Sequence, residues 1–260
     1  MKDRKIAVGL FGFGKTGRLA ASEILHDHDC DLKWVVRRSA EDAGDFASQH
    51  LGVKGESGRI VPMAQMQKKG FLEKNPVDVI IDFSDASALK SYIGEAAKLK
   101  IKVVSAISQY GKRDLNTLKR NSEKTAILHS PNITLGINVL LVASQVLKKI
   151  MPHADIEIVE EHFRGKREKS GTALKIAEHL GLDPKEHVNS IRVGGIIGRH
   201  EVIFGMKAQT VRLVHESISR AAFARGALFA TKWIVHKRKG LFSMEQLIRT
   251  KFMENLTESA

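Results

Sequence analysis

The residue types best suited to proton chemistry gather in one short stretch in the second half of the chain. His162 and Lys166 stand four residues apart in a basic loop, and Ser170-Gly171-Thr172 follows. Imidazole titrates near neutral pH and a partly desolvated lysine can do the same, so both side chains can deliver protons. Ser170 is a favoured residue at the start of a helix. The spacing therefore predicts acid/base groups beside a helix N-terminus.

That helix start has the chemistry of an anion-binding site. The backbone N–H groups of Gly171 and Thr172, the Thr172 hydroxyl and the positive end of the helix dipole suit a carboxylate or a phosphate. Arg164 adds a guanidinium that can meet a substrate carboxylate. The alternative for a bare Ser-Gly-Thr is a solvated charged loop before an ordinary capped helix, and the two proton-carrying side chains nearby favour function. We therefore assign Ser170, Gly171, Thr172 and Arg164 to substrate binding.

A strand and a helix must hold this stretch in place. Ile156 and Ile158 alternate with polar residues, as expected for a half-buried strand before the loop. After Ser170, apolar residues recur at helical spacing as far as Leu180, and Gly181 ends the run. The order is therefore strand, basic loop and helix start.

A second chemical motif lies near the beginning of the chain. Lys5 to Phe11 is an apolar strand, and an amphipathic helix with Leu19 and Ile24 follows a glycine-rich loop. The loop residues assigned to the cofactor are Gly12, Phe13, Gly14, Lys15, Thr16 and Gly17. Between a strand and a helix, Gly-x-Gly-x-x-Gly is the dinucleotide fingerprint, whose glycines allow a tight turn and close approach of the pyrophosphate. A glycine-rich turn without function is the weaker alternative.

The end of the second strand predicts which cofactor binds. An acidic residue about 20 residues after the glycines would grip the ribose 2′-OH of NAD. This chain has Arg37 and Arg38 there, after a strand over Leu32 to Val36. Two guanidiniums attract a 2′-phosphate and can hold it with paired hydrogen bonds, so we expect NADPH, with NADH as a possible second cofactor. Two surface arginines without a ligand are the alternative in so basic a chain.

Composition limits the class of protein. The chain has 260 residues, of which 43% are hydrophobic and 6% aromatic, as is ordinary for an α/β protein rich in aliphatic side chains. Cys30 is the only cysteine, the N-terminus has no signal-peptide core, and no apolar run reaches bilayer length. We therefore expect a cytoplasmic protein without an internal disulfide or a membrane partner.

The net charge of +13 raises the question of nucleic acid. Lysine and arginine are spread over the whole chain, and the one dense run lies at 236–239. The sequence has neither zinc-ligand spacing nor a basic motif interleaved with aromatic residues. We therefore expect no nucleic-acid partner and no metal, and we interpret the charge as a solvated surface with sites for anionic ligands.

Alternating strands and helices predict a parallel, doubly wound sheet in the first half of the chain. After the first two strands we expect strands at 59–61, 77–83, 101–105 and 126–129, and helices at 41–50 and 86–98. Pro131 and Gly136 mark a domain boundary before a helix over 138–151. Short strands over 191–197, 201–206 and 210–215 predict a mixed or antiparallel sheet. The expected class is α/β, with a Rossmann-type dinucleotide-binding domain and a second, α+β domain.

The catalytic stretch also resembles the signature of one enzyme family, the dihydrodipicolinate reductases, also called 4-hydroxy-tetrahydrodipicolinate reductases. The similar residues are Glu160-x-His162-x-x-x-Lys166 and Ser170-Gly171-Thr172-Ala173. The resemblance implies that His162 and Lys166 are the acid/base pair and that Gly171 and Thr172 hold a substrate carboxylate. It further implies NAD(P)H-dependent reduction of 4-hydroxy-tetrahydrodipicolinate, a small cyclic dicarboxylate, to tetrahydrodipicolinate in lysine and diaminopimelate biosynthesis.

Further motifs extend the resemblance over nearly the whole chain. Asp82-Phe83-Ser84, the turn over 130–138 and the segments around 198–201 and 215–227 resemble family patterns. By this resemblance, the additional cofactor residues are Phe83, Ser105, Ser130 and Asn132. It also implies a homotetramer with two domains. These are a dinucleotide-binding domain over 1–132, completed by 240–260, and a substrate-binding and oligomerisation domain over 133–239.

Three places depart from the family pattern. Phe163 stands where the family usually has a second histidine, and a one-residue-shorter Arg167-Glu168-Lys169 replaces Asp-x-Pro. Ser105-Ala-Ile-Ser108 occupies the place of a Gly-Thr-Thr-Gly loop. These departures leave two alternatives: a reductase of the same fold that acts on another small carboxylate, or a non-catalytic NADP-binding regulator.

Overall fold

The computed structural model describes residues 4–257, which form two compact units. The first unit contains the residues up to Thr134 together with Phe223–Leu247, and the second contains Leu135–Ala222 together with the residues from Ile248 onward. The expected boundaries, 1–132 with 240–260 and 133–239, differ from these units mainly in the C-terminal part. Most of α10 (Ala221–Ile234) groups with the first unit, whereas the residues from Ile248 onward group with the second.

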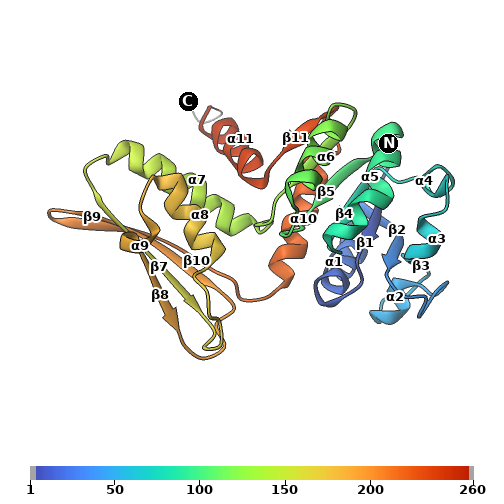
Figure 1. The fold of residues 1–260 in the computed structure, drawn as a ribbon, viewed down its shortest axis with the longest axis horizontal. Coiled ribbons are helices and arrows are strands. Elements are labelled where there is room, and N and C mark those ends of the chain that lie inside the picture. Colours follow the sequence, from blue (N-terminus) through green and yellow to red (C-terminus); the bar gives the residue numbers. More distant parts are fainter. Residues whose placement is uncertain (1–3, 258–260) are drawn as a thin grey trace. The chain divides into compact units, whose positions relative to one another are not determined.

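A seven-stranded parallel sheet forms the centre of the first unit (Figure 1), with strand order β11-β6-β5-β4-β1-β2-β3. The strands are β1 (Ile6–Phe11), β2 (Cys30–Arg37), β3 (Arg59–Pro62), β4 (Val79–Asp82), β5 (Lys102–Ser105), β6 (Ala126–His129) and β11 (Gly240–Phe242). Every residue of β4 is buried, as expected for a parallel strand with helices on both faces. The strand order reverses between β1 and β4, and ligands of such sheets bind at that point, beyond the carboxyl ends of the strands.

The helices of the first unit are α1 (Lys15–His26), α2 (Ala47–His50), α3 (Met63–Met66), α4 (Phe71–Lys74), the 3-10 turn η1 (Ala86–Ala88), α5 (Leu89–Lys98), α6 (Lys112–Ser122) and most of α10. Helix α11 (Met244–Thr257) begins in the first unit and continues into the second. The core between sheet and helices centres on Phe11, whose ring lies 4.5 Å from that of Tyr92 and 5.7 Å from that of Trp34. This apolar contact fixes the ends of β1 and β2, from which the cofactor-binding loop and the two arginines extend.

A four-stranded mixed sheet forms the second unit, with strand order β10-β9-β7-β8. Its elements are α7 (Leu135–Ile150), β7 (Asp155–His162), α8 (Gly171–Leu180), α9 (Pro184–His187), β8 (Val188–Arg192), β9 (Arg199–Met206) and β10 (Gln209–Glu216). β8 pairs with β7 in parallel, whereas the β7–β9 and β9–β10 pairs are antiparallel. Burial alternates along β7, so one face packs against α7 and α8 and the other is open. The two sheets confirm the expected α/β class.

Two expected elements are wrong in extent. The helix expected over 41–50 is reduced to α2, because Asp42 and Gly44 have φ angles of 61° and 94°, in the left-handed region that ends a right-handed helix. The strand expected over 191–197 is also wrong, because β8 ends at Arg192 and the chain turns at Gly194. Helix α6 was not expected from the sequence, and its side chains are mostly polar.

The described helices also bear on the membrane question. Within residues 4–257, every helix is too short or too polar to cross a bilayer.

Candidate active site

The expected acid/base histidine lies at the carboxyl end of β7, in the second unit. His162 is the last residue of the strand, and its side chain is 10% exposed. Its Nδ1 forms a hydrogen bond with the Oε2 of Glu160, which is two residues earlier on the same face and fully buried. A carboxylate that accepts from Nδ1–H leaves Nε2 as the nitrogen available for proton exchange.

Glu160 is itself held by a cluster of hydrogen-bond donors. Arg192 donates to both oxygens, at 2.6 Å and 2.9 Å, and Ser190 Oγ donates to Oε1 at 2.6 Å. Burial alone would raise the pKa of Glu160, but the bonds from Arg192, Ser190 and His162 outweigh it and lower the pKa to about 2. The carboxylate beside the imidazole is therefore ionised throughout the neutral range.

Ser170 occupies the expected N-cap position of α8, but its hydroxyl has a different partner. The Oγ lies 2.9 Å from Nε2 of His200, and the side chain makes no capping bond to the helix. The backbone N–H of Ser170 points to Oε1 of Glu160 at 3.3 Å. Burial, together with the nearby His162 and His215, lowers the pKa of His200 to about 4, so this ring is neutral near pH 7.

The start of α8 is open beside these buried groups. A Cβ added to Gly171 would meet nothing within 4 Å, and Thr172 is half-buried in the first turn. Lys166 is also half-buried, and within residues 4–257 its ammonium makes no ion pair. The side chain of Arg164 is exposed in the same loop. The structure thus brings the expected substrate residues to one edge of the second unit, with no acidic side chain in the first turn of α8.

The glycine-rich loop in the first unit has the geometry that its sequence predicts. Gly12 has a φ of +96°, and a Cβ there would lie 2.8 Å from the backbone of Phe83. A Cβ on Gly17 would lie 2.0 Å from the carbonyl oxygen of Gly12, whereas one on Gly14 would meet nothing within 4 Å. The first and third glycines therefore permit close backbone packing, and the second leaves room for a ligand.

A pocket of about 550 Å³ lies over this loop and the end of β2. Its lining includes Gly12, Phe13, Gly14, Val36, Arg37, Arg38, Met63, Phe83, Ser84, Asp85 and Ser87. Lys15 is exposed and Thr16 is half-buried in the first turn of α1, whose N-cap Gly14 makes no side-chain cap. The open helix N-terminus and the room above Gly14 fit a pyrophosphate.

Both arginines at this pocket already have acidic partners. Arg37 bonds to Asp42 and, at 2.6 Å, to Glu41, while Arg38 bonds to Asp85. The Arg38 side chain is 84% exposed, and that of Arg37 is 26% exposed. The basic end of the pocket therefore contains carboxylates as well as guanidiniums.

The other expected cofactor residues lie at the carboxyl ends of β5 and β6. Ser105 and Ser130 are buried, and their hydroxyls bond within the protein, to Tyr110 at 2.9 Å and to the carbonyl oxygen of Asn132 at 3.0 Å. Asn132 is half-buried in the following turn. These three residues are not among those that line the pocket, so their assignment to the cofactor stays a prediction.

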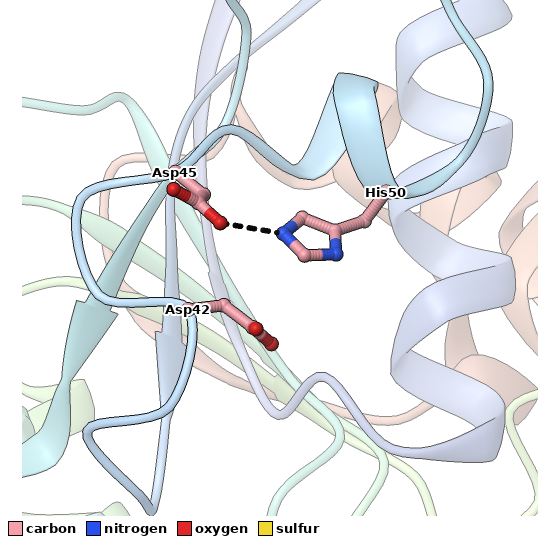
Figure 2. Close-up of side chains that lie close together, drawn as sticks. All are labelled: Asp42, Asp45 and His50. Atoms are coloured by element: carbon pink, nitrogen blue, oxygen red, sulfur yellow. Dashed lines mark hydrogen bonds and ion pairs between the residues drawn. The ribbon is translucent and has the colours of Figure 1, made fainter.

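Three side chains beside the pocket lie close enough to offer ligand atoms to a metal. Figure 2 shows Asp42, Asp45 and His50, whose ligand atoms lie within 4.8 Å of one another. His50 Nε2 already bonds to Asp45 at 3.1 Å, and Asp42 is paired with Arg37. Each of the three groups has a protein partner, and the Asp45 side chain is 55% exposed. We therefore interpret the cluster as hydrogen bonds that hold the turn after Arg37, and not as a metal site.

Comparison with known proteins identifies the family. The family models described as "Dihydrodipicolinate reductase, N-terminus" and "Dihydrodipicolinate reductase, C-terminus" match residues 6–133 and 136–248. The 4-hydroxy-tetrahydrodipicolinate reductase of Buchnera aphidicola subsp. Schizaphis graminum is 30% identical over 278 residues, covering 97% of this chain and 100% of that protein. The chain belongs to the dihydrodipicolinate reductase family.

Other members and a solved structure are also similar. The 4-hydroxy-tetrahydrodipicolinate reductase of Caldanaerobacter subterraneus subsp. tengcongensis is 35% identical over 197 residues, covering 68% of this chain and 78% of that protein. A dipicolinate-bound dihydrodipicolinate reductase from Paenisporosarcina sp. TG-14 has the same fold, with a TM-score of 0.74 at 20% identity over 92% of this chain and 97% of that one. The likeness covers both units.

The places that depart from the family signature have clear structural positions. Phe163, in place of the second histidine, is 47% exposed. The shortened segment 167–169 is anchored by Lys169, whose Nζ donates to the carbonyl oxygens of Pro184 and Val188 at 2.8 Å and 3.1 Å. Ile107 is buried and Ser108 is exposed in the altered loop after β5. None of the three replaces a group in the buried cluster around His162.

Sequence reasoning missed Arg192 and the role of Glu160. Glu160 was visible in the signature but had no assigned task, and Arg192 lies 30 residues after His162. The period-2 pattern of β7 could have revealed Glu160, because a glutamate on the apolar face of a strand requires a partner. The partner itself depends on the pairing of β7 with β8, which the sequence did not show.

Proposed function

We propose that this chain reduces 4-hydroxy-tetrahydrodipicolinate to tetrahydrodipicolinate with a nicotinamide cofactor, NADPH in preference to NADH. The observation that supports it best is the buried pair of His162 and Glu160 beside the open N-terminus of α8, in a chain of this family. A proton-carrying ring next to an anion-binding helix start suits a substrate that has carboxylates and must be protonated.

The second unit supplies the substrate chemistry. The N–H groups at the start of α8 and the Thr172 side chain bind one carboxylate, and Arg164 meets the other. The 4-hydroxyl group leaves as water, with His162 exchanging a proton through Nε2, and Lys166 donates or stabilises the proton that is added to the ring with the hydride. The positive loop over 163–169 also attracts a dianionic substrate.

The first unit supplies the cofactor site. The room above Gly14 and the uncapped start of α1 fit a dinucleotide, whose nicotinamide supplies the hydride when bound. Arg37 and Arg38 favour a 2′-phosphate, but each must share or release a carboxylate partner to bind one. The same carboxylates suit the 2′-OH of NADH, so the preference for NADPH is moderate and NADH is also a substrate.

Self-association is part of the proposal. The face of the four-stranded sheet that lacks helices exposes apolar side chains such as Ile191 and Val214, which are 44% and 52% exposed. Ile218, just after β10, is 88% exposed. Apolar residues in such positions suit a homo-oligomer, which light scattering on the purified protein would detect as a mass several times that of one chain.

Turnover is the direct test. NADPH oxidation is followed with and without freshly generated 4-hydroxy-tetrahydrodipicolinate, and then with other small unsaturated dicarboxylates. We expect oxidation that depends on the dipicolinate-type substrate and is slower with NADH. NADPH binding without turnover of any of these carboxylates would reject the proposal and favour a non-catalytic regulator.

A further inference from the structure

Arg192 donates five hydrogen bonds near the candidate site. A guanidinium has five N–H donors. Here Nε donates to the carbonyl oxygen of Lys166 at 2.9 Å, and the two terminal nitrogens donate to both oxygens of Glu160 and to the carbonyl oxygens of Ile191 and Glu168. All five donors are therefore used, by a side chain that is only 19% exposed.

These bonds join the two residues to which proton transfer is assigned. Through Glu160, Arg192 is one hydrogen bond away from the imidazole of His162. Through the carbonyl oxygens of Lys166 and Glu168, it holds the loop that carries the Lys166 ammonium. The arrangement follows from strand pairing, since Arg192 is the residue opposite His162 in the parallel pair of β7 and β8.

The partners of each Glu160 oxygen determine what a substitution would do. Oε1 accepts from Arg192, Ser190 and the N–H of Ser170, whereas Oε2 accepts from Arg192 and His162. A glutamine at this position would place its carbonyl oxygen where Oε1 meets three donors. Its NH₂ group would then face Nδ1 of His162, which must give up its proton to accept that bond.

The Nε2 side of the His162 ring is also constrained. A Cβ added to Gly198 would lie 3.1 Å from Nε2 of His162, so the backbone at Gly198 lies against the edge of the ring that carries this nitrogen. The ring of His200 crosses it at a centroid distance of 5.4 Å. Because this packing leaves little room for the ring to flip, the two ring nitrogens can change places as donor and acceptor only if the proton moves from one to the other.

We propose that Arg192 and Glu160 are positioning residues for the reaction: Glu160 fixes the Nδ1-protonated form of His162, and Arg192 fixes both that carboxylate and the Lys166 loop. Neither residue is a catalytic group, since each acts through another side chain. This inference rests on the proposed function, in which His162 and Lys166 handle the proton.

Nitrogen NMR on the full chain tests the positioning without substrate. Histidine labelled with ¹⁵N reports which ring nitrogen holds the proton, and His162→Ala identifies the His162 signals. We expect the Nδ1–H form in the wild type and the Nε2–H form in Glu160→Gln. An unchanged His162 signal in Glu160→Gln would overturn the proposal.

A matched control lies on the same strand. Glu157 also bonds to a histidine, with its Oε1 3.0 Å from Nδ1 of His187, and it accepts from Asn189 at 2.8 Å. It lies on the opposite face of β7, away from the start of α8. Glu157→Gln should therefore leave the His162 signal and the turnover at wild-type values. A change in either would mean that the effect of Glu160→Gln comes from a general disturbance of β7.

Steady-state kinetics completes the test and distinguishes a failure of the positioning proposal from a failure of the proposed function. We expect Glu160→Gln to lower kcat about 100-fold, within the range for loss of a positioned acid or base, with the KM for NADPH unchanged. Arg192→Lys keeps the charge but cannot make five bonds, so we expect about a tenfold fall in kcat even if Glu160→Gln folds poorly. A changed tautomer with wild-type turnover would support the positioning and overturn the acid/base role of His162. Wild-type turnover in Arg192→Lys would overturn the role of Arg192.

Discussion

The proposed cofactor site in the first unit and the proposed substrate site in the second differ in the exposure of their charged pairs. We call them the exposed edge and the buried edge. At the cofactor pocket, Arg38 and its partner Asp85 are 84% and 41% exposed, so water can replace either group. At the substrate edge, Glu160 is fully buried and Arg192 is 19% exposed. Exposed pairs contribute little to stability and exchange easily, whereas a buried pair is costly to break because it leaves an unpaired charge.

This contrast suits the two tasks. A cofactor that must bind and leave can compete for Arg38, whose ion pair with Asp85 is exposed and therefore weak. A proton-transfer group must keep one tautomer and one orientation through every turnover, which requires partners that do not exchange. The exposed pair can therefore give way to the cofactor, whereas the buried pair fixes the tautomer and orientation of the proton-transfer group.

The largest expected effect comes from removing the groups that the buried edge positions. His162→Ala and Lys166→Ala should each lower kcat by about 10²–10⁴-fold, the usual contribution of a positioned acid or base, without weakening NADPH binding. Thr172→Val should instead mainly raise the KM for the substrate, because it removes part of a carboxylate anchor. Steady-state kinetics distinguishes the two results. Wild-type turnover in both His162→Ala and Lys166→Ala would show that the catalytic centre lies elsewhere.

The buried His200 should make the free energy of unfolding depend on pH. Burial lowers the pKa of His200 to about 4 from an ordinary value of 6.5, so the unfolded chain binds a proton there first as the pH falls. Stability is therefore lost between about pH 6.5 and pH 4, by about 2 kcal/mol between pH 7.5 and pH 5 from this group. Urea unfolding at these two pH values would measure the loss.

His200→Gln should remove most of that pH dependence, whatever its effect on stability at neutral pH. His28→Gln, which changes an exposed histidine, is the control and should keep the wild-type difference. Equal pH dependence in the wild type and His200→Gln would contradict the neutral, buried state of His200. Glu160 has a pKa of about 2 and contributes its own loss only at lower pH, as the pH falls below about 4.5.

A smaller effect is expected at the exposed edge. Arg37→Ala and Arg38→Ala together should weaken NADPH binding by about 1–3 kcal/mol, the range for losing charge-assisted hydrogen bonds, and leave NADH binding nearly unchanged. Fluorescence titration with each cofactor measures both affinities. Equal losses for the two cofactors would reject the interaction with the 2′-phosphate.

The smallest expected effect concerns the carboxylate that competes for Arg38. Asp85→Asn removes the charge but keeps an oxygen for the N–H of Ser87, which Asp85 now accepts at 2.9 Å. Freed from its partner, Arg38 should bind NADPH more tightly, by up to about 1 kcal/mol, the worth of an exposed ion pair. NADH binding should not improve in the same titration. Tighter binding of both cofactors would mean that the gain is not specific to the 2′-phosphate.

The amino-acid sequence by itself determined the local parts of this protein. Strand and helix periods, the glycine spacing at Gly12, Gly14 and Gly17, and the position of Ser170 before α8 all depend on neighbouring residues, so they were predictable from short windows. The two-domain α/β class followed from the order of these elements. The helix expected over 41–50 failed where single residues, Asp42 and Gly44, adopt left-handed backbone.

Only the tertiary structure decided which partners these parts acquire. The pairing of β7 with β8 places Arg192 opposite His162, and packing of β9 beside β7 gives Ser170 the ring of His200 in place of a helix cap. The acidic partner of Arg38 likewise comes from a distant segment, the loop between β4 and η1, whereas those of Arg37 lie in the turn just after it. The contacts of Arg192, Ser170 and Arg38 depend on strand register and loop geometry, which join residues far apart in the chain and leave no periodic signal in it.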